Sequence, residues 1–162
     1  MSKKSSASVQ RVREALTAAG LDNEVQELAA STRSAVEAAD AVGCDVAQIV
    51  KSLVLKGATS GELFLVLTSG GNRVCLERIK NLAGEEVAMA DAGSVRERTG
   101  FAIGGVPPLG HLAPLQALID QDLMAHAVIW AAAGSPNALF HLTPEDLVRI
   151  TGGTVAVVAE GK

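Results

Sequence analysis

The stretch from Phe101 to His111 combines glycine and proline in a pattern that suits neither a helix nor a strand interior. Gly104 and Gly105 allow positive φ and the close approach of a partner to bare backbone, and the prolines that follow fix φ and remove backbone donors. Such a loop can present free N–H groups as a concavity that binds an anion or an oxyanion. The alternative is a tight connection between two sheet elements.

Lys51 is the second residue that could take part in chemistry. It lies in the apolar run 49–55, where an extended strand would place it on one face with Leu53 and Leu55, and Ser52 on the other. A lysine among apolar neighbours is costly to bury without an anionic partner, so we expect it to reach into a cleft where a ligand or a carboxylate compensates its charge. The alternative is a lysine at a strand end whose amine extends into solvent.

The other candidate nucleophiles and ligands give weaker signals. The histidines, His111, His126 and His141, are isolated, and no pair of them has metal spacing. Cys44 and Cys75 have no electropositive sequence setting that would activate a thiol. The glycine pair of the loop begins neither a dinucleotide fingerprint nor a P-loop. The sequence therefore predicts neither a metal site nor a cofactor.

Composition limits the classes of partner. The chain has 162 residues, which fits one domain, and only 2% of them are aromatic, which argues against an exposed platform for stacking bases. A net charge of −4 gives no general attraction to a polyanion, so we expect no DNA partner. Two cysteines suggest a reduced, cytoplasmic protein, and no apolar run reaches the roughly 18 residues of a membrane span, so no membrane partner is expected.

Hydrophobic periodicity and capping residues predict the elements that must position these candidates. Ser8 is expected to cap the first helix, and a short extended piece follows at 25–28. The predicted helices cover residues 8–19, 34–42, 76–83, 91–98 and 143–151. The predicted strands cover residues 49–55, 62–68, 86–90, 115–119, 127–133, 139–142 and 154–159.

These elements do not alternate strictly between strand and helix. We therefore expect an α/β chain of the α+β type, with a mixed, mostly antiparallel sheet or partial barrel surrounded by helices. Residues 1–7 are predicted to be a flexible tail and residues 8–162 a single domain.

The motifs around Lys51 and the glycine pair occur in the same order as in a known family. Residues 47–56, 90–101 and 104–111 resemble those of the YbaK/ProX family, the bacterial aminoacyl-tRNA deacylases related to the insertion (editing) domain of prolyl-tRNA synthetase. The resemblance runs from about residue 30 to the end of the chain. Either motif alone is weak, whereas the pair is fairly specific.

The resemblance implies a free-standing editing domain that hydrolyses the ester joining a wrong amino acid to a tRNA, without a metal or a covalent intermediate. Lys51 resembles the lysine that helps hold the 3′ end of the tRNA, and Gly104 and Gly105 resemble positions whose backbone amides orient the ester or the attacking water. In related members the terminal ribose hydroxyl assists. The residues expected to contact the substrate are Ser52, Pro107, Gly110, His111 and His141.

One departure from the family pattern concerns the strand 138–142. Some members carry an acidic or histidine residue there; in this chain Leu139 occupies the aspartate position, and His141 is only a rough counterpart. An apolar pocket distinguishes substrates that differ by one methylene group only about 10- to 200-fold, so we expect the protein to accept more than one amino acid.

The resulting hypothesis is that the protein acts in trans and hydrolyses the ester of a mischarged tRNA, with tRNA(Pro)-type errors such as Cys or Ala as its substrates. The partners are the aminoacyl-tRNA acceptor end and, as a second candidate, prolyl-tRNA synthetase. The alternative is a non-catalytic module that binds a tRNA or a synthetase. A general nucleic-acid-binding protein is a weaker alternative, because the chain is acidic.

Overall fold

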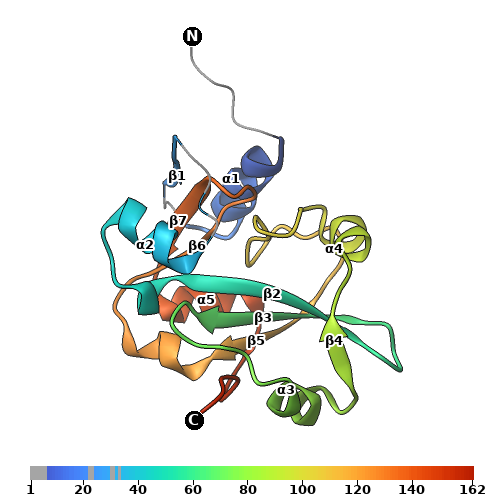
Figure 1. Ribbon diagram of the computed structural model, residues 1–162. Coiled ribbons are helices and arrows are strands. Elements are labelled where there is room, and N and C mark those ends of the chain that lie inside the picture. Colours follow the sequence, from blue (N-terminus) through green and yellow to red (C-terminus); the bar gives the residue numbers. More distant parts are fainter. Residues whose placement is uncertain (1–6, 22–23, 30–31, 33) are drawn as a thin grey trace.

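The described residues form two β-sheets with helices packed around them (Figure 1); Lys51, Ser52 and His141 lie in the sheets, and the glycine–proline loop, residues 101–111, lies between α4 (Ala92–Thr99) and β5 (Gln116–Asp120). The computed structural model describes residues 7–21, 24–29, 32 and 34–162. The larger sheet has the order β4-β2-β3-β5-β8, and the smaller sheet has the order β1-β7-β6. The strands are β1 (Val25–Glu27), β2 (Val50–Gly57), β3 (Leu63–Ser69), β4 (Val87–Met89), β5 (Gln116–Asp120), β6 (Ile129–Ala132), β7 (Ala138–Leu142) and β8 (Thr154–Ala156).

Most strand pairs are antiparallel; the exceptions are β3 with β5 and β5 with β8. The expected mixed, mostly antiparallel architecture is therefore confirmed: the described residues form two sheets and no closed barrel. An isolated bridge between Ile49 and Trp130 joins the start of β2 to β6. This bridge brings the smaller sheet against the end of β2 that carries Lys51.

The central position of β3 follows from its sequence. All seven of its residues are buried, as an apolar run without alternation requires. On one face, Leu65 and Leu67 join the largest core cluster, together with Phe101 and Phe140. On the other face, Phe64 packs in a second cluster with residues of β2 and α3. The sheet thus has core on both sides.

The described residues form five α-helices, each close to its predicted range: α1 (Ala7–Ala18), α2 (Ala35–Val42), α3 (Leu76–Ala83), α4 (Ala92–Thr99) and α5 (Pro144–Thr151). The expected caps are present at Ser34, Asp91 and Thr143, where each side-chain oxygen accepts a backbone N–H of the first turn. Within the described residues, no helix is long and apolar enough to cross a membrane.

Several element boundaries differ from the sequence-based expectation, and four of the differences follow. Helix α1 already includes Ala7, so Ser8 lies inside the helix instead of capping it, and the rest of the expected tail, residues 1–6, lies outside the described residues. Strand β6 covers only 129–132, and β8 ends at Ala156. Residues 121–125 form a 3-10 helix, because the Asp120 side chain accepts the N–H of Asp122 and turns the chain there.

Candidate functional site

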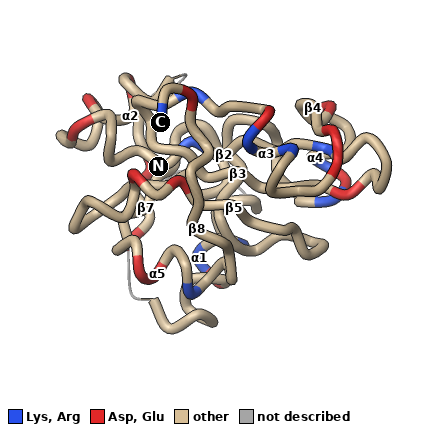
Figure 2. Tube along the Cα trace, turned by 90° about the horizontal axis from the view of Figure 1, so that it is seen from below, with Lys and Arg blue, Asp and Glu red and all other residues tan. Residues whose placement is uncertain are grey.

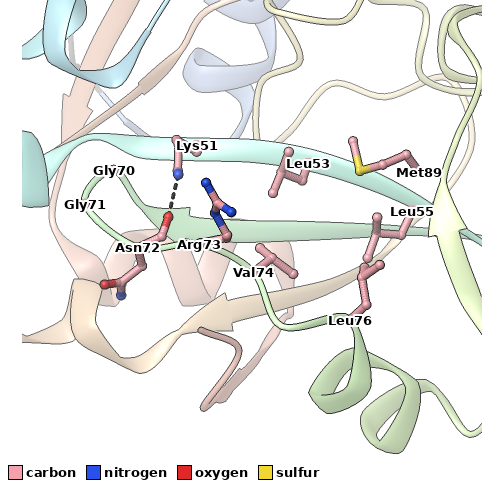
Figure 3. A pocket seen from close by; sticks show the side chains of 10 residues that line it. All are labelled: Lys51, Leu53, Leu55, Gly70, Gly71, Asn72, Arg73, Val74, Leu76 and Met89. Atoms are coloured by element: carbon pink, nitrogen blue, oxygen red, sulfur yellow. Dashed lines mark hydrogen bonds between the residues drawn. The ribbon is translucent and has the colours of Figure 1, made fainter. Parts of the chain in front are cut away.

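Lys51 lies where two hollows of the surface meet. The first, the loop cavity, has a volume of about 260 Å³ and lies between β2, the start of α2, the loop after α4, and the β6–β7 pair. The second, the cationic groove, has a volume of about 480 Å³ and runs along the other side of β2 (Figure 3). Lys51 and Leu53 line both hollows. A ligand that spans the two would therefore pass Lys51.

The Lys51 side chain lies in the cationic groove with Leu53 and Leu55, on the strand face predicted for it. Its ammonium donates a hydrogen bond to the backbone carbonyl of Asn72. The pKa of Lys51 is lowered, first by burial and then by the positive charge of Arg73, while the negative charge of Asp120 acts in the opposite direction. The lysine thus occupies a cleft as expected, but its direct partner is a carbonyl group and not a carboxylate.

Asp120 fixes the turn that receives the Lys51 ammonium. This buried carboxylate, 1% exposed, accepts the backbone N–H of Ser69 at 3.0 Å and the side-chain amide of Asn72 at 2.9 Å. Gly70 completes the turn, since a Cβ there would lie 2.3 Å from the Val46 carbonyl oxygen. Sequence reasoning missed Asp120, because the predicted strand ended at residue 119. The available signal was a carboxylate directly after an apolar strand.

Ser52 faces the loop cavity from the opposite face of β2. Backbone groups alternate between the two edges of an antiparallel strand, and the Val54 carbonyl accepts the Ala90 N–H on the β4 side. The backbone groups of Ser52, two residues earlier, therefore point to the same edge. Strand β4 pairs only with residues 55–57 of β2, so no described strand pairs with Ser52 there. Its buried hydroxyl also lacks a hydrogen-bond partner among the described residues.

Gly104 brings the loop after α4 to the cavity. Its φ of +96° lies in the region that favours glycine, and a Cβ there would meet only Pro136, at 3.9 Å. In the described part of the chain, its N–H has no hydrogen-bond partner. Gly104 thus combines an exposed position on the cavity wall with an N–H that a ligand can use.

Gly105 has a different role from the one expected for it. Its N–H donates to the Ala102 carbonyl at 3.0 Å, and its own carbonyl accepts the Gly134 N–H at 3.0 Å. A Cβ at this position would lie 2.7 Å from the Ser135 Cα, so only glycine fits against the β6–β7 connection. The expectation that both amides face a ligand is therefore corrected. The Gly105 N–H is bonded to the Ala102 carbonyl, and Gly105 allows the loop to pack closely against the β6–β7 connection.

The second half of the loop does not reach the cavity. His111 Nε2 lies 2.7 Å from the Pro107 carbonyl oxygen, and its ring packs edge-on against Phe101. Pro107 is buried, and Gly110 lies beside Ala15 of α1. Gly110 and His111 line a separate hollow bounded by α5 and β5. Pro107, Gly110 and His111, which we expected to contact the substrate, therefore do not line the loop cavity; they hold the loop against the body of the protein.

His141 lies on the β7 face that carries Leu139, but it does not line the loop cavity. It is paired with Trp130 across the β6–β7 ladder, and the two rings meet at 5.1 Å. Leu139, in contrast, forms part of the cavity wall with Ala132. The structure therefore places an apolar side chain, and neither a carboxylate nor an imidazole, at this wall.

The charge distribution gives no extended basic face. Figure 2 shows basic segments on and beside α3 and α4, interspersed with acidic segments. Lys80, for instance, is paired with Glu86 at 2.8 Å. Basic side chains that could meet an anion are therefore available locally, at Lys51 and Arg73, and not as a continuous field.

The Cys44 thiol and the residue types that bind metals are further candidates for chemistry in the described part of the chain. Burial, and after it the negative charge of Asp45, raises the pKa of the Cys44 thiol, which disfavours a thiolate. The described residues also contain no group of three or more His, Cys, Asp or Glu side chains that could hold a metal. The site can supply a cation, a hydroxyl group and backbone donors around a small apolar cavity.

Comparison with known proteins identifies the family to which the chain belongs. The family model of the aminoacyl-tRNA editing domain matches residues 29–150. A crystal structure described as a candidate trans-editing enzyme for prolyl tRNA synthetase is 50% identical, with a TM-score of 0.93, over 98% of this chain and all of that chain.

Two more distant relatives extend over most of the chain. YwhH of Bacillus subtilis (strain 168) is 29% identical over 140 residues, which is 86% of this chain and 88% of YwhH. EbsC of Enterococcus faecalis (strain ATCC 700802 / V583), named as a candidate Cys-tRNA(Pro)/Cys-tRNA(Cys) deacylase, is 25% identical over 126 residues, 77% of this chain and 76% of EbsC. The family match covers both Lys51 and Gly104, and the protein belongs to the aminoacyl-tRNA editing domain family.

Proposed function

We propose that the protein hydrolyses, in trans, the ester of a tRNA mischarged with a small amino acid, and that the reaction takes place in the loop cavity. The observation that carries the proposal is the meeting of Lys51, Ser52 and Gly104 at one small cavity that opens beside a cationic groove. The acceptor end would lie along the groove and the aminoacyl group in the cavity. The ester would then lie close to Lys51. Such a substrate places the reaction in the cytoplasm.

Ester hydrolysis requires mainly positioning and stabilisation of the developing oxyanion. Water attacks the ester carbonyl carbon, the bond to the ribose oxygen breaks, and that oxygen receives a proton, which gives the free amino acid and an uncharged tRNA. The N–H of Gly104, which has no partner in the described chain, is the donor proposed for the carbonyl oxygen. The Ser52 hydroxyl is proposed to orient the ester or the attacking water.

The described lining of the loop cavity contains no carboxylate, imidazole or thiol that could act as a general base. We therefore assign proton transfer to water and to the vicinal hydroxyl of the terminal ribose, which the substrate itself supplies. Lys51 holds the acceptor end by its positive charge. Half-burial reduces solvent screening of that charge, so the attraction to a phosphate is stronger than at an exposed lysine.

The size and the walls of the loop cavity favour a small side chain. Ala35, Ala38, Ala132 and Leu139 supply much of the wall around a volume of about 260 Å³. Alanine and cysteine are the side chains we propose, on tRNA(Pro). The description of EbsC supports cysteine and tRNA(Pro), the description of the similar solved protein supports prolyl-tRNA synthetase as the source of the error, and alanine is proposed from the small apolar walls alone. Prolyl-tRNA synthetase is the proposed source of such errors and a candidate partner.

A panel of aminoacylated tRNAs tests this substrate class. Purified protein is incubated with Ala-, Cys-, Pro- and Phe-charged tRNA(Pro), with and without prolyl-tRNA synthetase, and amino-acid release is followed. We expect Ala or Cys to be released fastest and Phe more slowly, because a larger side chain in a cavity of about 260 Å³ leaves less room for the attacking water. The rates for Ala and Cys should differ by no more than about 200-fold, as expected for an apolar pocket. Release of Phe at the rate of Ala would contradict the proposed selectivity.

A further inference from the structure

The turn after β3 carries the carbonyl group that Lys51 contacts, and Asn72 supplies it. Figure 3 shows this carbonyl facing the Lys51 ammonium, while the Asn72 side chain is directed away from it. An ammonium has three donors, so a bond to one fixed carbonyl limits its direction and leaves two donors for a ligand. The contacts that fix the Asn72 backbone therefore also fix Lys51.

The Asn72 side chain is held by two carboxylates. Its amide nitrogen lies 2.9 Å from an oxygen of Asp120 and 2.8 Å from an oxygen of Asp122. A side-chain amide has two N–H donors, and here each has an ionised acceptor. One hydrogen bond alone would let the amide rotate about the bonded oxygen, whereas two fix its orientation. Because the side chain is short, they also fix the backbone of Asn72.

The two carboxylates differ in how they act on Lys51. Asp120 is buried, and its negative charge favours the charged form of Lys51 directly. Asp122 is not among the charges that shift the pKa of Lys51. The pKa of Asp122 itself is lowered, and the hydrogen bond from Asn72 is the largest cause. Asp122 therefore acts on Lys51 through Asn72 and not through its charge.

Asp122 has a second contact, with Lys162. The Asp122 oxygen that accepts from Asn72 also lies 3.2 Å from the Lys162 ammonium. The two side chains of this ion pair are 33% and 43% exposed, and an exposed ion pair contributes little. The hydrogen bond to Asn72 is therefore the contact of Asp122 that matters for the turn, and the ion pair with Lys162 adds little to it.

We propose that Asp122 is a positioning residue for Lys51: it fixes the Asn72 amide, and with it the carbonyl that holds the Lys51 ammonium where the two hollows meet. The inference rests on the proposed function, because it concerns the lysine that holds the acceptor end there. Asp122 lines neither hollow and takes no part in bond breaking. It acts by its acceptor oxygen, so asparagine can replace it and alanine cannot.

Deacylation kinetics test this role with Asp122→Ala, Asp122→Asn and Asp146→Ala. Asp146 is the matched control, because its side chain is 32% exposed and forms an ion pair with Arg149 outside both hollows. We expect Asp122→Ala to lower kcat/KM about tenfold, as for the loss of one charged hydrogen bond. Asp122→Asn should recover most of this loss, and Asp146→Ala should stay within about twofold of wild type.

The same substitution in a Lys51→Ala background distinguishes positioning from a general structural role. If Asp122 acts through Lys51, Asp122→Ala should cause no further loss of rate there, because residues that act through one another are not additive. Where wild type hydrolyses the substrate, a full tenfold loss in that background would overturn the proposal. An unchanged rate for Asp122→Ala alone would overturn it as well.

The Lys51 ammonium gives a readout that does not require hydrolysis. An ammonium bonded to a fixed carbonyl exchanges its protons with water more slowly than a free one, so proton–nitrogen NMR spectra at low temperature detect it. Lys51→Ala assigns the signal. We expect the signal in wild type and Asp122→Asn and its loss in Asp122→Ala. If urea unfolding shows that Asp122→Ala does not fold, Asn72→Ala removes the same hydrogen bond and should lose the signal too. A signal that persists in the folded variant, or is missing from wild type, would overturn the proposal.

The two readouts separate this inference from the proposed function. If wild type hydrolyses no aminoacyl-tRNA but the Lys51 signal depends on Asp122, the function fails and the positioning role stands. If wild type hydrolyses the substrate and Asp122→Ala matches it in both rate and signal, the positioning role fails and the function stands.

Discussion

At the scale of single residues, the site depends on a few groups whose bonding is incomplete within the chain. Lys51 is half-buried beside a second cation, and the Ser52 hydroxyl and the Gly104 N–H lack partners among the described residues. Of these groups, the Ser52 hydroxyl is the buried one without a partner, and a buried polar group without a partner costs stability, so it is uncommon unless it serves a ligand. Lys51 could be predicted from the sequence as a candidate, because a lysine within an apolar strand is unusual. The unpaired strand edge at Ser52 could not be predicted, because it depends on where the pairing of β4 with β2 ends.

Ser52→Ala tests whether its unpartnered hydroxyl serves the substrate. We expect the free energy of unfolding to stay the same or rise, because a buried hydroxyl without a partner is removed, and the deacylation rate to fall about tenfold through loss of one hydrogen bond. Thr68→Val is the matched control: the Thr68 hydroxyl is also buried and unpartnered in the described chain but does not line the cavity. Urea unfolding and single-turnover deacylation measure the two quantities. Equal rates for Ser52→Ala and wild type would exclude a substrate contact.

At the scale of elements, the loop after α4 has two halves with different roles. Gly104 lies at the cavity, whereas His111 and Gly110 attach the loop to its neighbours, including α1. The sequence predicted an irregular loop here and a helix over 91–98 before it, and α4 ends at Thr99. It could not predict which half faces a ligand. That depends on contact with the β6–β7 connection, about 30 residues further along the chain.

Gly105→Ala should damage the site indirectly. The added Cβ would lie 2.7 Å from the Ser135 Cα, so backbone must shift, and we expect a loss of about 1–3 kcal/mol in the free energy of unfolding together with slower deacylation. Gly104→Ala provides the comparison, because its Cβ meets nothing closer than 3.9 Å and it should lose only about 1 kcal/mol from its positive φ. Denaturant unfolding of both variants gives the values. A Gly105→Ala variant as stable as wild type would rule out the proposed role of Gly105 in packing the loop against the β6–β7 connection.

At the scale of the whole molecule, local signals predicted the elements, and long-range contacts decided the site. Helix α5 was readable from Thr143 and the proline that follows it, because caps act within one turn. The pairing of β1 with β7, and the parallel pairing of β3 with β5, join segments far apart in sequence, and no local pattern specifies them. The same holds for Asp120, whose role appears only when β5 lies beside the turn after β3.

The stability of the whole molecule should depend on pH through His111. Burial, and with it the nearby charge of Arg11, lowers the pKa of His111 below its ordinary 6.5, although the contact with the Pro107 carbonyl acts in the opposite direction. A lowered pKa means that the unfolded chain binds the proton more readily, so stability is complete above pH 6.5 and falls as the pH decreases below it.

Thermal unfolding between pH 7.5 and 5 is the measurement for this effect. His111→Gln, which keeps a donor for the Pro107 carbonyl, should lose less stability on acidification than wild type. His126→Gln is the comparison variant, since this histidine lies at the end of the 3-10 helix and outside the loop. If the stability of His111→Gln and of wild type falls equally with decreasing pH, the buried His111 ring does not contribute to the pH dependence of stability.

The most direct test of the account is the rate of amino-acid release from Ala- or Cys-charged tRNA(Pro) by wild type, Lys51→Ala and Lys56→Ala. Both substitutions remove a lysine from β2, but Lys56 lies on the opposite strand face and lines neither hollow. We predict that wild type and Lys56→Ala release the amino acid at similar rates and that Lys51→Ala is slower by at least about 100-fold, as expected when a partly buried charged contact to the substrate is lost. Equal rates for Lys51→Ala and wild type, or no release by wild type from either substrate, would contradict the central claim.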